Sequence, residues 1–475
     1  MEWILNVISF LGIFGLCAIA WLGSEDRRSI PWKVLFWGIG LQLIIGVLVF
    51  QVPVTRSLIS GLNDVLNAVI DASEAGARFL FGSVIVPKPG GALGPGDAGR
   101  WISRAISSPY VPLPGDRLDG QFLNLGYIFA FRALPQVIFF SAIVALLYRM
   151  GAIQPIIQVF AQIFQATMKI SGAESLSGAA NIFVGIESAI AVKPFLADMT
   201  RSEICAILAS CFGSIASTVL ALYASLLRPI FPTITGHLMS ASILTIPACF
   251  VIAKILVPEK GEPKTMGGIP EAPEEEAEKK PSYMDSLILG ALDGVNMAKG
   301  IAAVIIAIIA LVALLNTIFA SLAGLADSNL LPLHLVGIVF SVVTLDNIFG
   351  VLFVPFTFLT GVSLDWQEIW QSSVLIGQRV LQTSIPPYLK LASLSGQGLI
   401  SDRAMLIVSY ILCGFAHIPS YGIFVGGLSN LVPERRSEIS SLGWKSLWAA
   451  TLATLMTGCI AGLFYFGDSG SVLGK

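Results

Sequence analysis

Residues 175–193 read SLSGAANIFVGIESAIAVK, and this stretch decides how the rest of the chain is interpreted. It lies among apolar segments of membrane length, yet Gly178 and Gly185 interrupt it, and Asn181 and Glu187 place polar groups in its middle. Backbone N–H and C=O groups cannot stay unpaired against lipid, so a broken polar segment at membrane depth must be buried in protein or line a cavity. We predict a re-entrant hairpin with its tip near Gly185. An intramembrane carboxylate is costly, which makes Glu187 the strongest functional candidate.

The composition excludes a soluble globular protein. Of the 475 residues, 55% are hydrophobic and only 12% are charged, whereas soluble domains carry about 25% charged residues. We therefore predict an integral membrane protein, and the net charge of −2 argues against a nucleic-acid partner. The six cysteines lie in apolar runs and the three histidines are far apart, so neither a disulfide framework nor a zinc motif is predicted. No paired base and nucleophile is visible, so we do not expect an enzyme.

The fold class that we predict is an all-α membrane protein, because segments of about 20 mostly apolar residues recur along the chain. The predicted spans are Trp3–Leu22 (retained rather than cleaved as a signal peptide), Val34–Phe50, Tyr127–Leu147, Ile204–Leu227, Ile234–Val257, Ile301–Leu325, Met405–Leu428 and Leu447–Phe464. Amphipathic interfacial helices are predicted at Thr55–Phe81, Ile153–Met168 and Asp285–Lys299. Leu333–Val362 either spans the membrane or lies at its interface.

Four hydrophilic segments connect these elements. Val84–Asn124 is rich in Pro and Gly and is predicted to be an external loop, and Glu259–Ser282 is a charged cytoplasmic linker. The basic segments Ser24–Lys33 and Pro433–Lys445 are predicted to be cytoplasmic loops, because arginine and lysine concentrate on that side of a membrane.

A second stretch echoes the first. Trp370–Ser395 reads WQSSVLIGQRVLQTSIPPYLKLASLS, and its arginine, hydroxyl residues and paired prolines rule out a plain lipid-facing helix. We predict a second re-entrant hairpin there. Each hairpin is followed by a span broken by small and polar residues, at Phe212–Thr218 and at Cys413–Ser420. Paired interrupted segments in two inverted halves are typical of a transporter's binding site.

Several motifs, in order along the chain, resemble those of the concentrative nucleoside transporters. They are FAFRALP at 129–135, FFS at 139–141, ESLSGAANIFVG at 174–185, KPFL at 193–196, CGFA at 413–416 and PERR at 433–436. The chain resembles the bacterial form of this family. The resemblance implies about eight spans, two re-entrant hairpins, interfacial helices, a homotrimer and residence in the bacterial inner (plasma) membrane, in contact with lipid.

The resemblance also implies a scaffold part and an inverted-repeat transport part. Residues 1–170 and 300–369 would form the scaffold, with spans 1–3 and span 6. Residues 171–258 and 370–475 would be the first and second transport halves, each with a hairpin and a broken helix, and residues 259–299 the linker with an interfacial helix.

A sodium site is implied by the same resemblance, and no other cofactor. It would lie between the first hairpin tip and the first broken helix, at Asn181, Val184, Thr218 and Val219. Oxygen ligands suit this hard cation. Proton coupling is the alternative, since some bacterial members use it.

The substrate motifs differ from the family pattern. At the first tip the family has Gln-Thr-Glu, whereas this chain has Gly185, Ile186 and Glu187 in a run that is one residue shorter. Glu187 aligns with the family's Glu, but the base-reading amides are absent. At the second tip Thr383 and Ser384 stand in a run where the family has Asn-Glu, and the ribose-binding carboxylate becomes a serine. A site that reads a hydroxyl can reject an analogue without it by about four to five orders of magnitude, so these changes bear on substrate choice.

In the second broken helix the family's Phe-Ala-Asn-Phe-Ser-Ser becomes FAHIPS at 415–420, so His417 replaces the ribose-binding Asn while Phe415 and Ser420 are kept. Here His417 is a substrate donor, a proton-coupling group or a buried neutral residue. Arg379 either pairs with Glu187 or anchors a hairpin arm at the membrane surface, where we also place Lys193. The predicted substrate-binding residues are Gly185, Ile186, Glu187, Tyr223, Thr383, Ser384, Phe415, His417 and Ser420.

These features predict a symporter, driven by Na+ or H+, that imports nucleosides or a closely related polar solute by an elevator-type alternating-access mechanism. The alternative keeps the fold and gives the site to a nucleobase-like or non-nucleoside solute.

Overall fold

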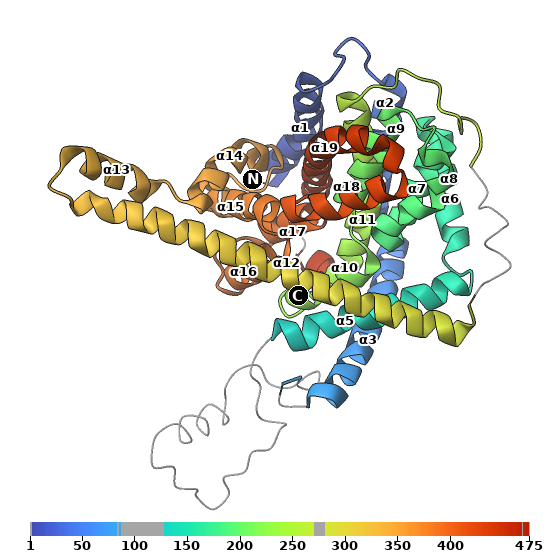
Figure 1. The fold of residues 1–475 in the computed structure, drawn as a ribbon, viewed down its shortest axis with the longest axis horizontal. Helices are drawn as coiled ribbons and strands as arrows, with labels where there is room; N and C mark the ends of the chain where they lie inside the picture. The colour runs from blue at the N-terminus through green and yellow to red at the C-terminus, as the bar shows by residue number, and fades with distance from the viewer. Residues whose placement is uncertain (1, 83–84, 87–127, 270–280, 468, 475) are drawn as a thin grey trace, which may run out of the picture. The chain divides into compact units, whose positions relative to one another are not determined.

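The computed structural model describes residues 2–82, 85–86, 128–269, 281–467 and 469–474, and within them the fold is built from helices (Figure 1). The first half contains α1 (Glu2–Leu22), α2 (Trp32–Phe50), α3 (Pro53–Phe81), α5 (Phe129–Arg149), α6 (Gln154–Met168), α7 (Gly172–Val184), η1 (Gly185–Val192), α8 (Lys193–Leu196), α9 (Arg201–Gly213), α10 (Ser217–Leu227) and α11 (Ile234–Leu256). The second half contains α12 (Tyr283–Ala323), η3 (Gly324–Asp327), α13 (Leu331–Val342), α14 (Leu345–Leu359), α15 (Trp366–Leu381), α16 (Ile385–Gly396), α17 (Asp402–Leu412), α18 (Ile418–Leu431), η4 (Pro433–Arg435), α19 (Arg436–Leu463) and α20 (Ser469–Leu473). No strand occurs in these ranges, which confirms the all-α prediction.

Seven helical segments of the described ranges are long and apolar enough to cross a membrane, when α9 and α10 (Arg201–Leu227) are counted as one segment. They match seven of the eight predicted spans. The other prediction, Met405–Leu428, falls on α17 and α18, which are separated by a break. The undecided segment Leu333–Val362 forms the pair α13 and α14, bent by 55°, and this pair would be an eighth span if it crosses as one.

Two predicted boundaries are wrong. Asp285–Lys299 and Ile301–Leu325 form one continuous helix of 41 residues, α12, because Gly300 does not interrupt the backbone. Pro433–Lys445 is not a loop but η4 and the first turns of α19. An ion pair between Arg435 and Glu438, 2.6 Å long and one helical turn apart, stabilises the start of α19. The predicted loop Val84–Asn124 and part of the linker Glu259–Ser282 lie outside the described residues.

The chain divides into two compact units. The smaller comprises residues 64–150 and 281–302, and its helices approach closely. A Cβ atom added at Gly290 would lie 2.5 Å from Cβ of Ala145, and one added at Gly294 would lie 2.6 Å from Cα of Ile138. Small residues of this kind allow helices to pack in a membrane. In the same unit Arg132 of α5 pairs with Glu74 of α3 at 2.6 Å.

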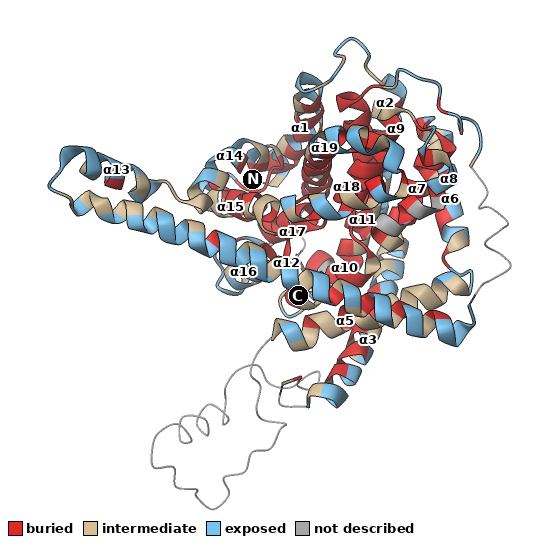
Figure 2. Cartoon of the chain, in the orientation of Figure 1, coloured by how far each residue is buried: buried red, intermediate tan, exposed pale blue. Residues whose placement is uncertain are grey.

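The larger unit comprises residues 1–63, 151–280 and 303–475 and holds both predicted hairpins. Its core is formed by α11 and α19, which pack against each other and against α9, and which are buried along most of their length (Figure 2). In contrast, α12 is exposed along most of its length although it is strongly apolar. A helix of this kind suits contact with lipid tails.

Candidate functional site

The first predicted hairpin is formed by α7, η1 and α8. A capping box starts α7, because Oγ of Ser171 accepts from N–H of Glu174 and the Glu174 carboxylate accepts from N–H of Ser171 at 3.0 Å. The helix ends at Gly185, whose φ of 67° suits a residue without a side chain. Beyond it, η1 packs against α7, with the hydroxyls of Ser177 and Ser188 3.5 Å apart. The tip therefore lies at Gly185, as predicted.

A broken helix follows and is joined to this hairpin. α9 ends at Gly213 and α10 starts at Ser217, so the break falls within the predicted segment Phe212–Thr218. The hydroxyl of Ser214 in the break donates to the carbonyl of Asn181 at 3.0 Å. This bond fixes the last turn of α7 against the break.

The second half repeats the same plan. α15 and α16 form the second hairpin, and α17 and α18 are the arms of the second broken helix. The hydroxyl of Ser384, at the turn of the hairpin, donates to the carbonyl of Gly414 in the break at 3.1 Å. In addition, the hydroxyl of Tyr388 donates to the carbonyl of Ser409 at 2.7 Å. Each hairpin is thus hydrogen-bonded to its own broken helix.

The two halves meet at their breaks. A Cβ atom added at Gly414 would lie 2.5 Å from the carbonyl oxygen of Gly213, so the backbones are in direct contact there. The halves also cross over, since η1 packs against α18 and α10 packs against α16. Where α10 meets α16, the rings of Tyr223 and Tyr388 lie 4.8 Å apart. The hairpins and the broken helices therefore converge on one region.

Two predicted cation ligands leave polar atoms unpaired. Asn181 is fully buried, and neither atom of its side-chain amide has a partner among the described residues. The hydroxyl of Thr218, 7% exposed, likewise has none. Buried polar groups are normally satisfied, so unpaired oxygens near a helix break fit a site for a hard cation. Val219 is buried and Val184 is partly buried.

The predicted substrate residues of the second half surround the second break. Thr383 and Ser384 are buried at the hairpin turn, and the hydroxyl of Thr383 has no partner in the described ranges. Phe415 packs against the rings of His417 and Phe424, each 5.9 Å away.

His417 is the N-cap residue of α18. Its Nδ1 accepts from the backbone N–H of Ser420 at 3.2 Å, so Nδ1 is unprotonated and the neutral ring carries its hydrogen on Nε2. The hydroxyl of Ser420 donates to the carbonyl of His417 at 2.6 Å and is therefore engaged within the break. In the first half, Gly185 forms the tip, while the side chains of Ile186 and Glu187 lie outside the described part of the structure.

Arg379 corrects the prediction of an anchor at the membrane surface. The side chain is fully buried in the second hairpin, with Nη1 donating to the carbonyl of Ile411 at 2.5 Å and to the hydroxyl of Thr454 at 3.0 Å. Lys193, by comparison, is exposed.

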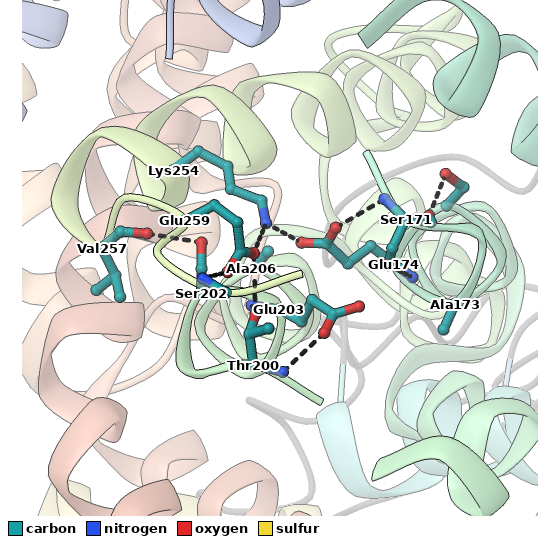
Figure 3. A network of polar contacts seen from close by, with 12 residues as sticks. Ser171, Ala173, Glu174, Thr200, Ser202, Glu203, Ala206, Lys254, Val257 and Glu259 are labelled. Carbon is teal, nitrogen blue, oxygen red and sulfur yellow. Dashed lines mark hydrogen bonds and ion pairs between the residues drawn. The ribbon is translucent and has the colours of Figure 1, made fainter. Parts of the chain in front are cut away.

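A buried charge network lies at the base of the first hairpin and was not predicted (Figure 3). Nζ of Lys254 pairs with Glu174 at 2.6 Å and with Glu259 at 3.1 Å. Figure 3 shows that these side chains come from α7, α11 and the segment after α11, with Thr200 and Glu203 adjacent. The hydroxyl of Thr200 donates to Glu259 at 2.9 Å. The network joins the start of the first hairpin to α9 and α11.

Three family models match the chain. One described as the N-terminus of a Na+ dependent nucleoside transporter matches residues 11–84, one described as nucleoside recognition matches residues 130–230, and one described as the C-terminus of a Na+ dependent nucleoside transporter matches residues 237–462.

Individual proteins match over nearly the whole length. An uncharacterized transporter of Haemophilus influenzae is 31% identical over 96% of this chain and 97% of its own. The uncharacterized transporter YutK of Bacillus subtilis is 32% identical over 97% of this chain and 100% of its own. The structure of CNTnw in an inward-facing substrate-bound state matches with a TM-score of 0.80 and 31% identity, covering 97% of this chain and 98% of that chain. Outward-facing and intermediate states of CNTnw match as well.

Proposed function

The chain belongs to the family of Na+-dependent concentrative nucleoside transporters, which are integral membrane transporters rather than enzymes, and from this premise we propose that it is a cation-coupled symporter that imports nucleosides or a closely related polar solute. The alternative is the same transport of a nucleobase-like or non-nucleoside solute, favoured by the replaced motif residues at Gly185, Ile186, Ser384 and His417.

The observation that carries this proposal is the repeated hairpin and broken-helix plan. Ser214 bonds the first break to the first hairpin, and Ser384 bonds the second hairpin to the second break. The breaks contact each other at Gly213 and Gly414. Helix breaks at membrane depth expose half-helix ends that hold a polar solute and a cation, and they are tolerated only where protein or a cavity covers them.

An elevator-type mechanism is part of the proposal. In it, residues 171–258 and 370–475 carry the site across the membrane against a scaffold of residues 1–170 and 300–369, with residues 259–299 as the connection. The support is that CNTnw, similar over nearly the whole chain, has inward-facing, intermediate and outward-facing states. A homotrimer in the bacterial plasma membrane belongs to the same proposal.

Sodium is the proposed coupling ion, with Asn181, Val184, Thr218 and Val219 as the residues that would hold it. The unpaired amide of Asn181 and the unpaired hydroxyl of Thr218 fit this ion. Bound Na+ would supply positive charge at the site and link import to the sodium gradient. The chain's own contribution is to hold these oxygens in place, through the bond from Ser214 to the carbonyl of Asn181.

The solute is proposed to contact Glu187, Thr383, Phe415 and His417, together with the remaining residues of the predicted set. Phe415 offers an aromatic face for a flat ring, and the unpaired hydroxyl of Thr383 offers a donor or an acceptor.

Uptake by the purified full-length protein in proteoliposomes tests the function. Labelled uridine, adenosine and uracil are offered under an imposed sodium gradient, a proton gradient or none. We expect accumulation that requires a gradient, and sodium dependence that is lost in Asn181→Leu and Thr218→Val. Thr317→Val, a substitution of an exposed hydroxyl in α12, serves as the matched control. If the labelled compound only reached equal concentrations inside and outside under every imposed gradient, coupled transport would be contradicted.

A further inference from the structure

One edge of the Arg379 guanidinium is unused. Nη1 makes both hydrogen bonds of the group, whereas Nε and Nη2 are buried and have no partner among the described residues. The described residues also place no carboxylate oxygen within 4.0 Å of this side chain, which is fully buried. Nε–H and one N–H of Nη2 lie parallel on the same edge of a guanidinium, and this edge forms the two-bond contact with a carboxylate.

Burial of these unpaired donors costs free energy unless a ligand binds to the unused edge of the guanidinium. Buried donors are almost always satisfied, and a buried cation without an anion is strongly disfavoured in a membrane protein. Arginine keeps its proton in all ordinary conditions, so the charge cannot be relieved by titration. A fully buried guanidinium with a free fork is therefore expected to be completed by an anion during function.

The edge lies in the region where the two halves converge. The carbonyl of Ile411, which accepts from Nη1, belongs to the last turn of α17, directly before the second break. Tyr223, Tyr388 and His417 lie close enough to interact electrostatically with the guanidinium. The site is thus part of the second hairpin and break rather than of the membrane surface.

Two further polar groups near the second break are donors or can act as donors. Because Nδ1 of His417 accepts from Ser420, the ring's hydrogen is on Nε2 and is available to an acceptor. The hydroxyl of Thr383 is buried without a partner in the described part of the chain. The residues at the turn of this hairpin, Gln382–Ser384, carry no formal charge. The cation of Arg379 and these donors favour a ligand with negatively charged acceptors.

We propose that the transported solute is a planar heterocycle, free or in a nucleoside, that carries a carboxylate or an equally acidic oxygen, and that this group binds the Nε and Nη2 edge of Arg379. His417 donates a further hydrogen bond from Nε2, and the aromatic rings of the site pack on the heterocycle. This inference rests on the proposed transport function and specifies its substrate class.

Binding to the purified full-length protein tests the inference independently of transport. Orotate and orotidine serve as the acidic heterocycle and its nucleoside, and uracil and uridine as their neutral counterparts. Affinities are measured by calorimetry and by the rise in melting temperature. We expect at least one acid to bind more tightly than its neutral counterpart by about 30-fold or more, the lower end for a buried charged hydrogen bond. The two acids together tell whether the ribose is required.

Three variants separate recognition from folding. Arg379→Gln should lose the preference for the acid while it still binds the neutral counterpart, and Arg379→Lys, which keeps the charge without the fork, should lose part of it. Ser384→Glu places a carboxylate at the hairpin turn and should turn the preference towards the neutral compound, a gain that a misfolded protein cannot produce. Arg403→Gln is the matched control, since that arginine is buried but fully paired, and it should leave the ratio of affinities unchanged.

The outcomes distinguish failure of the role assigned to Arg379 from failure of the proposed transport function. Neutral compounds that bind as well as both acids, or an acid preference that persists in Arg379→Gln, would overturn the assignment of Arg379. Loss of the acid preference in Glu187→Gln but not in Arg379→Gln would overturn it as well. In contrast, binding that depends on Arg379 without gradient-driven uptake of any of the four compounds would uphold the site and remove the transport function.

Discussion

Two buried arginines of the larger unit are satisfied in different ways. Arg403 in α17 uses all three of its nitrogens, which donate to the carbonyl of Gly361 at 2.7 Å, to Asn6 at 2.7 Å, to Glu2 at 3.0 Å and to the hydroxyl of Ser9 at 3.2 Å. Arg379 in α15 uses Nη1 alone. Arg403 therefore joins α1 to α17 as part of the fold, whereas Arg379 keeps an edge that the fold does not use.

Whether all nitrogens of a buried guanidinium are paired within the fold distinguishes a structural cation from a functional one. A buried charge that only stabilises the fold should be saturated by local groups, because unpaired buried donors cost free energy. A buried charge that serves a ligand must keep donors free until the ligand arrives. Replacement of a structural arginine should therefore destabilise the fold more than replacement of an arginine that serves a ligand.

The largest effect is expected when the free energies of unfolding of Arg403 and Arg379 variants are compared. Arg403→Leu should lower the free energy of unfolding by about 3 kcal/mol or more, because it leaves several buried acceptors without a donor. Arg379→Leu should lower it by about 1 kcal/mol or less, since Thr454 also bonds within its own helix and an unpaired charge is removed. Melting of both purified variants in the same detergent gives the comparison. Equal losses would mean that Arg379 is as structural as Arg403.

A third buried cation provides the next test. Lys254 pairs with the buried Glu174, so Lys254→Met leaves that carboxylate uncompensated and should cost about 3 kcal/mol. The double variant Lys254→Met/Glu174→Gln removes both charges and should recover a large part of the loss. The four-variant cycle is measured by thermal melting, and a coupling energy near zero would show that the pair is not energetically linked.

The contact between the two breaks can be broken by a single methyl group. Gly414→Ala would place a Cβ atom 2.5 Å from the carbonyl oxygen of Gly213, next to the carbonyl groups that hold Arg379 and Ser384. We expect a loss of about 1–3 kcal/mol from overpacking, with a reduction in solute binding. Gly426→Ala in α18 is the matched control, because nothing lies within 4 Å of an added Cβ atom there. Equal melting temperatures for the two variants would contradict the contact.

Much of this architecture follows from the sequence alone. The tip at Gly185 was predictable, because a glycine that lies between Asn181 and Glu187 in an otherwise apolar segment leaves few alternatives for the backbone. The breaks after Gly213 and Leu412 were predictable from clusters of small and polar residues. These features depend on residues that are neighbours in the chain, which is why local physical rules recover them.

Other features depend on partners far away in the sequence. The burial of Arg379 requires Thr454 of α19 and Ile411 of α17, and no local pattern in α15 announces either contact. The pairing of Glu174 with Lys254 likewise joins α7 to α11. The continuity of α12 could not be deduced, since Gly300 is compatible with both a boundary and a helix interior.

The smallest effect on stability is expected at a partly exposed charge cluster formed by Glu25, Arg201 and Lys445. Glu25, between α1 and α2, accepts from Arg201 at 2.9 Å and from Lys445 at 2.5 Å, and the hydrogen bond from Arg201 is the main cause that lowers the pKa of Glu25 to about 2. A lowered carboxyl pKa stabilises the fold above the pKa of the unfolded chain, and this contribution is lost as the pH falls towards the folded value.

Glu25→Gln should therefore lower the free energy of unfolding by about 1 kcal/mol at pH 7, a value limited by solvent screening of a partly exposed group. The difference from the parent protein should shrink as the pH falls from about 4.5 towards 2, because Glu25 then becomes protonated in the parent. Lys445→Met is the companion variant and should show a smaller loss with the same pH dependence, since Arg201 remains in place. Melting temperatures of the three proteins from pH 7 to pH 3 provide the measurement. A constant difference over that range would mean that the pKa of Glu25 is not lowered by its partners.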